Sequence, residues 1–173
     1  MNIGICTSAE NIKMVENMGF DYVESSVTGI VQLDHDEFDR IARQVDDSSI
    51  KCEAFNVLFP GNIKLTGPGV DIGEIQSYLE RAFDRITLLG AKVVVFGSGG
   101  SRRIPDGFNR EKAWNQLVEV ASAGTMGRFT YTYALTDAGR RRARDAMERS
   151  QYIGPAPIPI DKYTTMLVLQ TNR

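Results

Sequence analysis

The chain has 173 residues, of which 42% are hydrophobic and 24% charged, as in an ordinary soluble globular protein. This length fits one domain with at most a small appendage. The net charge of −2 argues against nonspecific nucleic-acid binding by the whole chain. No apolar run approaches the roughly 18 residues of a membrane helix. The start, MNIGICTSAEN, lacks the pattern of a signal peptide, so a cytoplasmic protein is expected.

Strands and helices alternate through the first two thirds of the chain. Short apolar runs predict strands over residues 2–7, 21–27, 50–59 and 91–100. Apolar residues at helical spacing predict helices over residues 9–20, 34–48, 71–91 and 109–122. Ser8 and Asn109 are expected to cap two of them, and a loop is expected between the second strand and the second helix.

This order predicts an α/β fold with a (βα)₄ core, because strands that alternate with helices pair in parallel through right-handed crossovers. Two architectures share the pattern. One is an open, doubly wound parallel sheet. The other is half of a (βα)₈ barrel, since a whole barrel needs eight such units and about 250 residues. The sequence pattern leaves both open.

The pattern changes after residue 122. Residues 1–122 hold 12 Lys and Arg against 18 Asp and Glu (12 − 18 = −6), whereas residues 123–173 hold 8 against 4 (8 − 4 = +4). Residues 128–136, RFTYTYALT, alternate as in a half-exposed antiparallel or edge strand. An arginine-rich helix over 137–150, a proline-rich extended segment, and an apolar segment at 164–169, either strand or helix, are expected to follow. We therefore predict two parts, 1–122 and 123–173, with the second packed on the first.

The first part resembles a known family. The segments GFDYVE, FNVLFPGNIKLTGP and LLGAKVVVFGSGGSRRIPDGF are similar, in order and spacing, to sugar phosphate isomerases and epimerases, the xylose-isomerase-like TIM barrels. The resemblance covers residues 1–121, which correspond to the first four βα units. In that family most metal-binding acids and the histidine come from later strands. The resemblance thus implies a half-barrel, with a divalent metal only if the family's activity is retained, and otherwise no cofactor.

The second part resembles something different. Residues 128–163 are similar to a winged-helix-like segment near the end of certain bacterial AAA-type ATPases. There is no Walker motif in this tail, so no ATPase activity is implied. The two resemblances together suggest a chimera, recombined or engineered, joined near residues 121–127. Such a folding unit is expected to lack catalytic turnover; the alternative is a metal-dependent sugar-phosphate isomerase or epimerase.

The segment FGSGGSRR, residues 96–103, is the first candidate site. Ligands of parallel α/β folds bind at the carboxyl ends of strands, where glycine N–H groups can approach an anion. A solvated turn is the competing interpretation, and position 102 departs from the dinucleotide fingerprint. The candidate phosphate or sugar-phosphate ligands are Asn56, Gly97, Gly99, Gly100, Arg102 and Arg103.

Strand-end carboxylates are the second candidate. Glu24 lies near the end of the second strand, and Glu53 and Asn56 lie in the third. Paired carboxylates there can do acid–base work or hold a divalent metal. The family resemblance implies that Glu24, our candidate catalytic residue, lies near the sugar site. A polar contact inside a barrel layer is the competing interpretation.

Histidine and cysteine provide few further options. His35 is the single histidine, and we expect it to be a solvated residue at a helix start. Because there is one histidine in total, a multi-histidine metal centre within this chain is excluded. We expect no metal site. Cys6 and Cys52 lie in apolar runs without CxxC spacing and are predicted to be buried free thiols.

Binding partners are predicted from the free edge of the sheet and from the basic charge of the tail. Four parallel units leave a free sheet edge, which the tyrosine-rich strand or a second copy of the chain can cover, so a homodimer is expected. The arginines at 140–144 also allow nucleic-acid or partner binding. However, they surround the predicted helix instead of lining one stripe, which favours a solvated basic helix.

Overall fold

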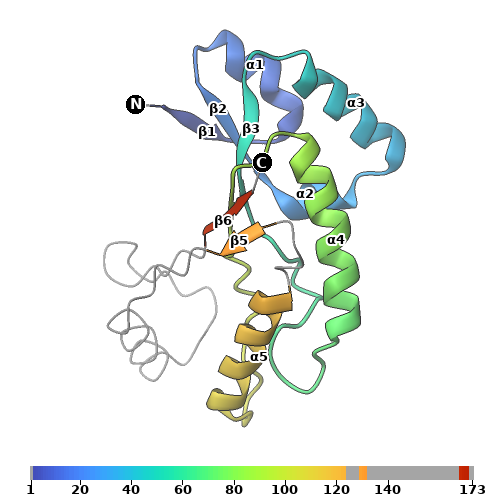
Figure 1. Ribbon diagram of the computed structural model, residues 1–173, viewed down its shortest axis with the longest axis vertical. Helices are drawn as coiled ribbons and strands as arrows, with labels where there is room; N and C mark the ends of the chain where they lie inside the picture. The colour runs from blue at the N-terminus through green and yellow to red at the C-terminus, as the bar shows by residue number, and fades with distance from the viewer. Residues whose placement is uncertain (1, 124–128, 132–167, 172–173) are drawn as a thin grey trace.

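The computed structural model describes residues 2–123, 129–131 and 168–171 (Figure 1). The strands are β1 (Gly4–Cys6), β2 (Tyr22–Ser26), β3 (Lys51–Asn56), β4 (Val93–Val95), β5 (Phe129–Tyr131) and β6 (Val168–Thr171). The helices are the 3₁₀ turn η1 (Ala9–Asn11), α1 (Ile12–Asn17), α2 (Val27–Gln32), α3 (His35–Asp46), α4 (Ile72–Leu88) and α5 (Arg110–Ala123). All eight elements predicted for the first 122 residues are present.

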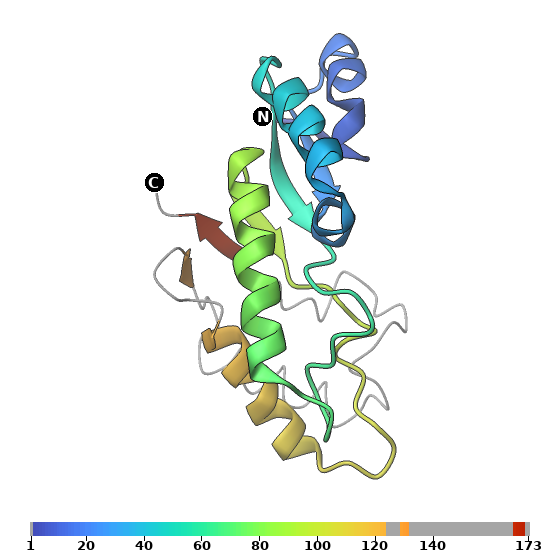
Figure 2. The same ribbon diagram turned by 90° about the vertical axis from the view of Figure 1, so that its right-hand side faces the viewer.

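These strands form one open sheet in the order β1-β2-β3-β4-β6-β5. Strands β1 to β4 are parallel, as predicted, whereas β6 runs antiparallel to β4 and β5 antiparallel to β6. Helices α1 to α4 lie on one side of the parallel strands (Figures 1 and 2). A doubly wound sheet carries helices on both faces. The arrangement is therefore a half-barrel wall.

Burial alternates across the parallel strands in agreement with this one-sided cover. Val23, Phe55 and Val94 are fully buried and belong to the hydrophobic core that also contains apolar residues of α1, α3 and α4. Their strand neighbours Glu24 and Asn56 are half-buried on the opposite face, which would line the inside of a closed barrel.

A bulge in β3 sets the faces of that strand. Tyr22 is paired with Lys51 and Glu24 with Ala54, so β3 carries one more residue than β2 between these pairs. Because of the extra residue, Cys52 and Phe55 are both buried although they are three positions apart. The bulge thus changes which side chains of β3 share a face.

Local capping explains where the longer helices begin. Asp34 and Glu37 form a reciprocal capping box at the start of α3. Asp71 caps α4, and Asn109 accepts from the N–H of Lys112 in α5 at 2.9 Å, as predicted. Ser8 precedes η1, but its side chain makes no capping hydrogen bond, so this predicted cap is wrong.

Helix α2 corrects the predicted loop after β2. The segment VTGIVQ has two β-branched valines and a glycine, all poor helix formers, so its sequence did not predict a helix. Arg85 of α4 supplies the stabilising contact: its Nη1 donates to the carbonyl oxygens of Ile30 at 2.8 Å and Leu33 at 2.7 Å. This cap from a distant helix satisfies carbonyl groups at the end of α2.

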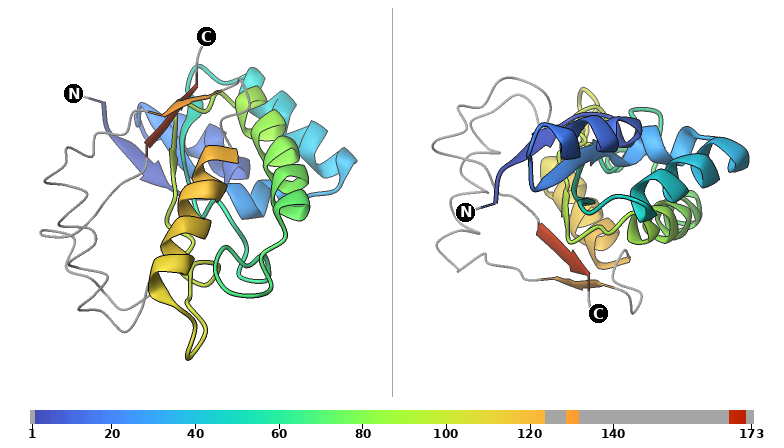
Figure 3. Two further views of the ribbon diagram at one scale, coloured as in Figure 1. Left: turned by 60° about the horizontal axis from the view of Figure 1, so that its bottom comes forward. Right: turned by 90° about the horizontal axis from the view of Figure 1, so that it is seen from above.

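The far edge of the sheet differs in one respect from the prediction. Residues 129–131 form an antiparallel strand at the sheet edge, as expected, but they do not cover β4. The free edge of β4 is covered by β6, in which Val168 pairs with Val95 and Gln170 with Val93. Figure 3 shows β6 and β5 from two further sides. The segment left open as strand or helix is thus a strand over Val168–Thr171.

Several predictions for the tail lie outside the described residues. They include the arginine-rich helix at 137–150, the proline-rich segment, and nearly all of the region that resembles a winged helix. Within the described ranges, none of the helices combines the length and apolar character needed to span a membrane.

Candidate functional site

Three chemically capable side chains meet at the carboxyl ends of the first three strands. Asn56, the last residue of β3, donates from Nδ2 to Glu24 Oε1 on β2 at 2.8 Å. The same nitrogen lies 3.3 Å from Cys6 Sγ at the end of β1. The strand ends are aligned by a backbone hydrogen bond from the Thr7 N–H to the Glu24 carbonyl, at 2.9 Å. The predicted residues Glu24 and Asn56 are therefore brought together.

Glu53, the other predicted carboxylate, takes a different partner. It forms an ion pair with Lys92, with 2.6 Å between Glu53 Oε1 and Lys92 Nζ. The two residues are also joined through their backbones, since the Lys92 N–H donates to the Glu53 carbonyl at 2.8 Å. The site thus pairs a carboxylate with an amide, and the expected pair of carboxylates, Glu24 with Glu53, is a wrong prediction.

The two cysteines differ in exposure, although both were predicted to be buried. Cys52 is fully buried beneath the helices, and this burial raises the pKa of its thiol to about 12. Cys6 is exposed. The reason is alternation: Cys6 pairs with Glu24 across β1 and β2, so both side chains lie on the face away from the helices. The prediction for Cys6 is therefore wrong.

The loop at residues 97–103 is firmly joined to the loop after β3. Ser98 Oγ accepts from the Phe59 N–H at 2.7 Å, and Ser101 Oγ donates to the Pro60 carbonyl at 2.8 Å. Both serines are buried. Thr66 Oγ1 adds a bond to the Arg103 carbonyl at 2.8 Å. The predicted phosphate loop is consequently part of a packed pair of loops at the mouth of the half-barrel.

Several N–H groups of this loop already have acceptors. The Gly97 N–H donates to the Val95 carbonyl at 2.9 Å. The N–H groups of Ser101 and Arg102 donate to the backbone carbonyl of Ser98 at 3.1 and 3.2 Å. These donors point into the loop itself. Gly100 is exposed and Gly99 half-buried. The expected anion cradle therefore retains fewer amide donors than its glycines suggest.

Arg102 folds back along its own loop. Its Nη2 donates to the Gly97 carbonyl, and its guanidinium carbon lies 5.7 Å from the centroid of the Phe96 ring. Burial lowers the pKa of the guanidinium, and its Nε is buried without a hydrogen-bond partner among the described residues. Arg103, by contrast, is exposed. The two predicted phosphate ligands thus lie in different environments.

One residue of the site carries no sequence signal. Val57, directly after Asn56, has φ of +47°, in the left-handed region that favours glycine and asparagine. Its side chain is 43% exposed. A valine in the run AFNVLF predicts a continuing strand, so sequence reasoning had no means of finding this turn.

Histidine takes no part in the strand-end cluster. His35 is at the start of α3, where Nε2 lies 3.7 Å from Asp39 Oδ2 and 85% of its side chain is exposed, as predicted. Among the described residues, no group of three or more His, Cys, Asp or Glu side chains is placed to hold a metal ion.

A solved structure has a similar fold. It is the apo form of a 3-keto-D-glucoside 4-epimerase from E. coli, which superposes with a TM-score of 0.52 at 11% sequence identity. The match covers 70% of this chain and 49% of the epimerase, so this chain spans about half the length of that enzyme. No family model matches the sequence, and no curated protein does.

At this identity the likeness shows the fold alone. The chain has a sugar isomerase- or epimerase-like α/β fold, with four parallel strands in an open sheet. The fold implied by the family resemblance of residues 1–121 is thereby confirmed.

Proposed function

We propose that the half-barrel is a sugar-binding unit that holds a sugar or sugar phosphate at the carboxyl ends of β1, β2 and β3, without catalytic turnover. The observation that carries this proposal is the 2.8 Å hydrogen bond between Asn56 Nδ2 and Glu24 Oε1. It brings a carboxylate and an amide together on the face away from the helices, at the sheet end where parallel α/β folds bind ligands.

The chemistry of the pair suits hydroxyl recognition. The Glu24 carboxylate accepts hydrogen bonds, and Asn56 offers a second amide proton and a carbonyl oxygen. A sugar hydroxyl can donate to one group and accept from the other. The half-buried position of both residues strengthens such bonds relative to water.

The same pair explains why we propose binding without turnover. Isomerisation and epimerisation move protons at carbon, which needs groups that exchange protons on both sides of the reaction. In the pair described here, Glu24 has an amide for its neighbour, and an amide does not exchange protons usefully at neutral pH. Glu53, which would supply a second carboxylate, is held by Lys92.

A second candidate is a sugar-phosphate isomerase or epimerase with a divalent metal. One observation favours a phosphate subsite: the buried Nε of Arg102 has no acceptor among the described residues, and Arg103 is exposed on the same loop. In this alternative the phosphate would bind to residues 97–103 and the metal would neutralise the intermediate.

The experiment is a calorimetric titration of the full chain with methyl β-D-glucoside, a 3-keto-glucoside and ribulose 5-phosphate. Saturable binding is expected for at least one sugar. The Kd should rise about tenfold or more in Glu24→Gln and Asn56→Ala, because each change alters or removes a half-buried hydrogen-bonding group. Glu53→Gln is the matched control, since it removes a carboxylate of β3 that faces Lys92.

Turnover is measured separately, by solvent deuterium incorporation into the bound sugar. No incorporation is expected. Unchanged affinity in both Glu24→Gln and Asn56→Ala would contradict the proposed site. Incorporation that requires a divalent metal and is lost in Glu24→Gln would establish the isomerase alternative instead.

A further inference from the structure

Val57 occupies an unfavourable backbone conformation at the edge of the proposed site. Among the described residues it is the only non-glycine residue with positive φ, at +47°. A β-branched side chain in this region is strained by contact with its own backbone. Strain of this kind persists only where the surrounding structure holds the residue in place.

Contacts on both sides hold the Val57 turn. Before it, Asn56 is in register with Ser26 in the β2–β3 ladder. After it, the Leu58 carbonyl accepts from the Tyr78 hydroxyl at 2.9 Å, and the Phe59 N–H donates to Ser98 Oγ at 2.7 Å. The chain therefore turns at Val57 because the residues on either side of it are anchored.

The valine side chain gains little from folding that would offset this strain. Leu58 and Phe59, the next two residues, are only 3% and 2% exposed, whereas Val57 is 43% exposed. Glycine would adopt the same backbone without strain, and asparagine nearly so. An apolar, exposed and strained residue next to the Glu24–Asn56 pair calls for a role outside core packing.

We propose that Val57 is a specificity-determining residue of the sugar site, which contacts the apolar face of a bound pyranose ring. This inference rests on the proposed function. A pyranose carries hydroxyls at its rim and C–H groups on its faces, so a site that binds it combines polar partners with an apolar surface. Glu24 and Asn56 supply the former, and Val57 follows Asn56 directly along the chain. The ligand class is therefore a cyclic sugar with C–H groups exposed on one face.

The test replaces Val57 by the two residues that tolerate its backbone angles. Val57→Gly removes the strain and the side chain but loosens the turn. Val57→Asn relieves most of the strain without that loosening and removes the apolar surface. Val57→Asn should unfold at a temperature a few degrees higher. Both variants should bind methyl β-D-glucoside at least fivefold more weakly than the native chain. Leu88→Ala, which shortens an exposed apolar side chain on α4, is the control and should change neither quantity.

Each outcome decides the matter. Wild-type affinity in Val57→Asn would overturn the inference, and if Glu24→Gln still lost binding, the proposed function would stand alone. A melting temperature that fails to rise in Val57→Asn would show that no strain is stored at Val57, which also overturns it. Absence of sugar binding by the native chain would overturn the proposed function and this inference together.

Discussion

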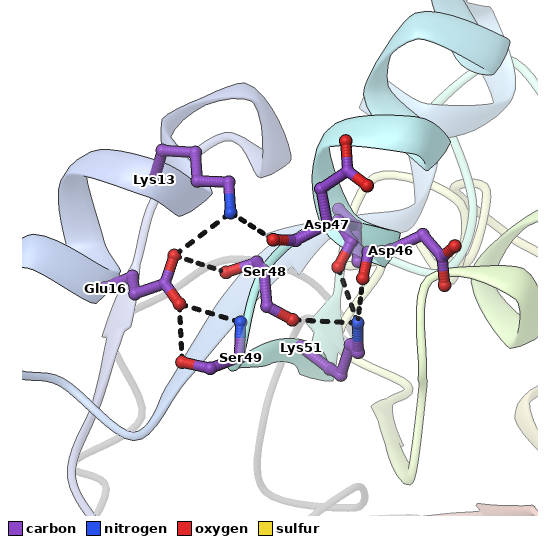
Figure 4. Close-up of polar contacts among 8 residues, drawn as sticks. Lys13, Glu16, Asp46, Asp47, Ser48, Ser49 and Lys51 are labelled. Carbon is purple, nitrogen blue, oxygen red and sulfur yellow. Dashed lines mark hydrogen bonds and ion pairs between the residues drawn. The ribbon is translucent and has the colours of Figure 1, made fainter.

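The carboxylate of Glu16 on α1 accepts a hydrogen bond from the backbone N–H of Ser49, with 2.7 Å between Oε1 and the nitrogen (Figure 4). The Ser49 hydroxyl donates to the same oxygen, and the Ser48 hydroxyl donates to Oε2 at 2.9 Å. Lys13 joins the cluster by donating to Glu16 and to the Asp47 carbonyl. One acidic side chain thus ties α1 to the connection between α3 and β3.

This cluster predicts acid sensitivity. Hydrogen bonds from the Ser49 hydroxyl and N–H, and then from Ser48, lower the pKa of Glu16 from 4.5 to about 2. Because the folded-state pKa lies below the unfolded value, the carboxylate stabilises the fold fully above pH 4.5. That contribution is lost as the pH falls from 4.5 to about 2. Glu16→Gln should therefore lower the urea midpoint at neutral pH and flatten its decline in acid.

Urea titrations between pH 2 and pH 7 measure this effect. Glu119→Gln is the matched control, because Glu119 is an exposed carboxylate on α5. If Glu16→Gln kept the native chain's acid dependence, the hydrogen bonds to Ser48 and Ser49 would not contribute to stability.

The two thiols should react at very different rates. Cys6 is exposed at the end of β1, whereas Cys52 is fully buried and its pKa is raised to about 12 by that burial. Since the thiolate is the reactive form, iodoacetamide at pH 8 should modify one cysteine of the folded chain and both only in denaturant. Mass spectrometry of peptides identifies the fast thiol. Rapid labelling of Cys6→Ser under native conditions would contradict the sheet faces described above.

Gly90 at the end of α4 should not tolerate a side chain. Its φ is +94°, and a Cβ there would lie 2.9 Å from Lys51 Cβ on β3. Gly90→Ala is expected to reduce the free energy of unfolding by about 1–3 kcal/mol through backbone strain alone. Gly61→Ala is the control, because nothing lies within 4 Å of a Cβ at that position. It should change stability by less than about 1 kcal/mol. Equal stabilities of the two variants in urea would contradict the strain at Gly90.

Self-association is expected through the free edge at β1. Met14 and Met18 are 53% and 60% exposed, and as i, i+4 neighbours they share one flank of α1. Lys13 and Glu16 take the flank that contacts the end of α3. The methionines therefore lie on the opposite flank, where a closed barrel would place its next unit.

A homodimer that uses this flank should dissociate in a Met14→Glu, Met18→Glu double variant. Sedimentation equilibrium of both proteins over a wide concentration range measures the change. Leu88→Glu on α4, where the native side chain is 71% exposed, should leave the association intact. A compact native monomer at every concentration would refute the homodimer.

Local signals in the sequence predicted most elements of residues 2–123. Phe38, Ile41 and Val45 repeat at helical spacing, and α3 forms there with all three side chains buried. The apolar run VVV at 93–95 predicted a buried strand, and β4 spans these residues with Val94 fully buried. Signals of this kind are contained within a few residues, so they can be recognised without the fold.

The sequence by itself also determined that Glu24 and Asn56 lie on consecutive strands of a parallel sheet. Only the tertiary structure decided that they pair with each other, because the bulge in β3 and the ion pair between Glu53 and Lys92 depend on adjacent strands. The same holds for the cap that Arg85 provides to α2 and for the turn at Val57. The pair, the cap and the turn all depend on groups that lie many positions apart in the sequence. Hydrophobic periodicity carries no information about contacts between such distant positions.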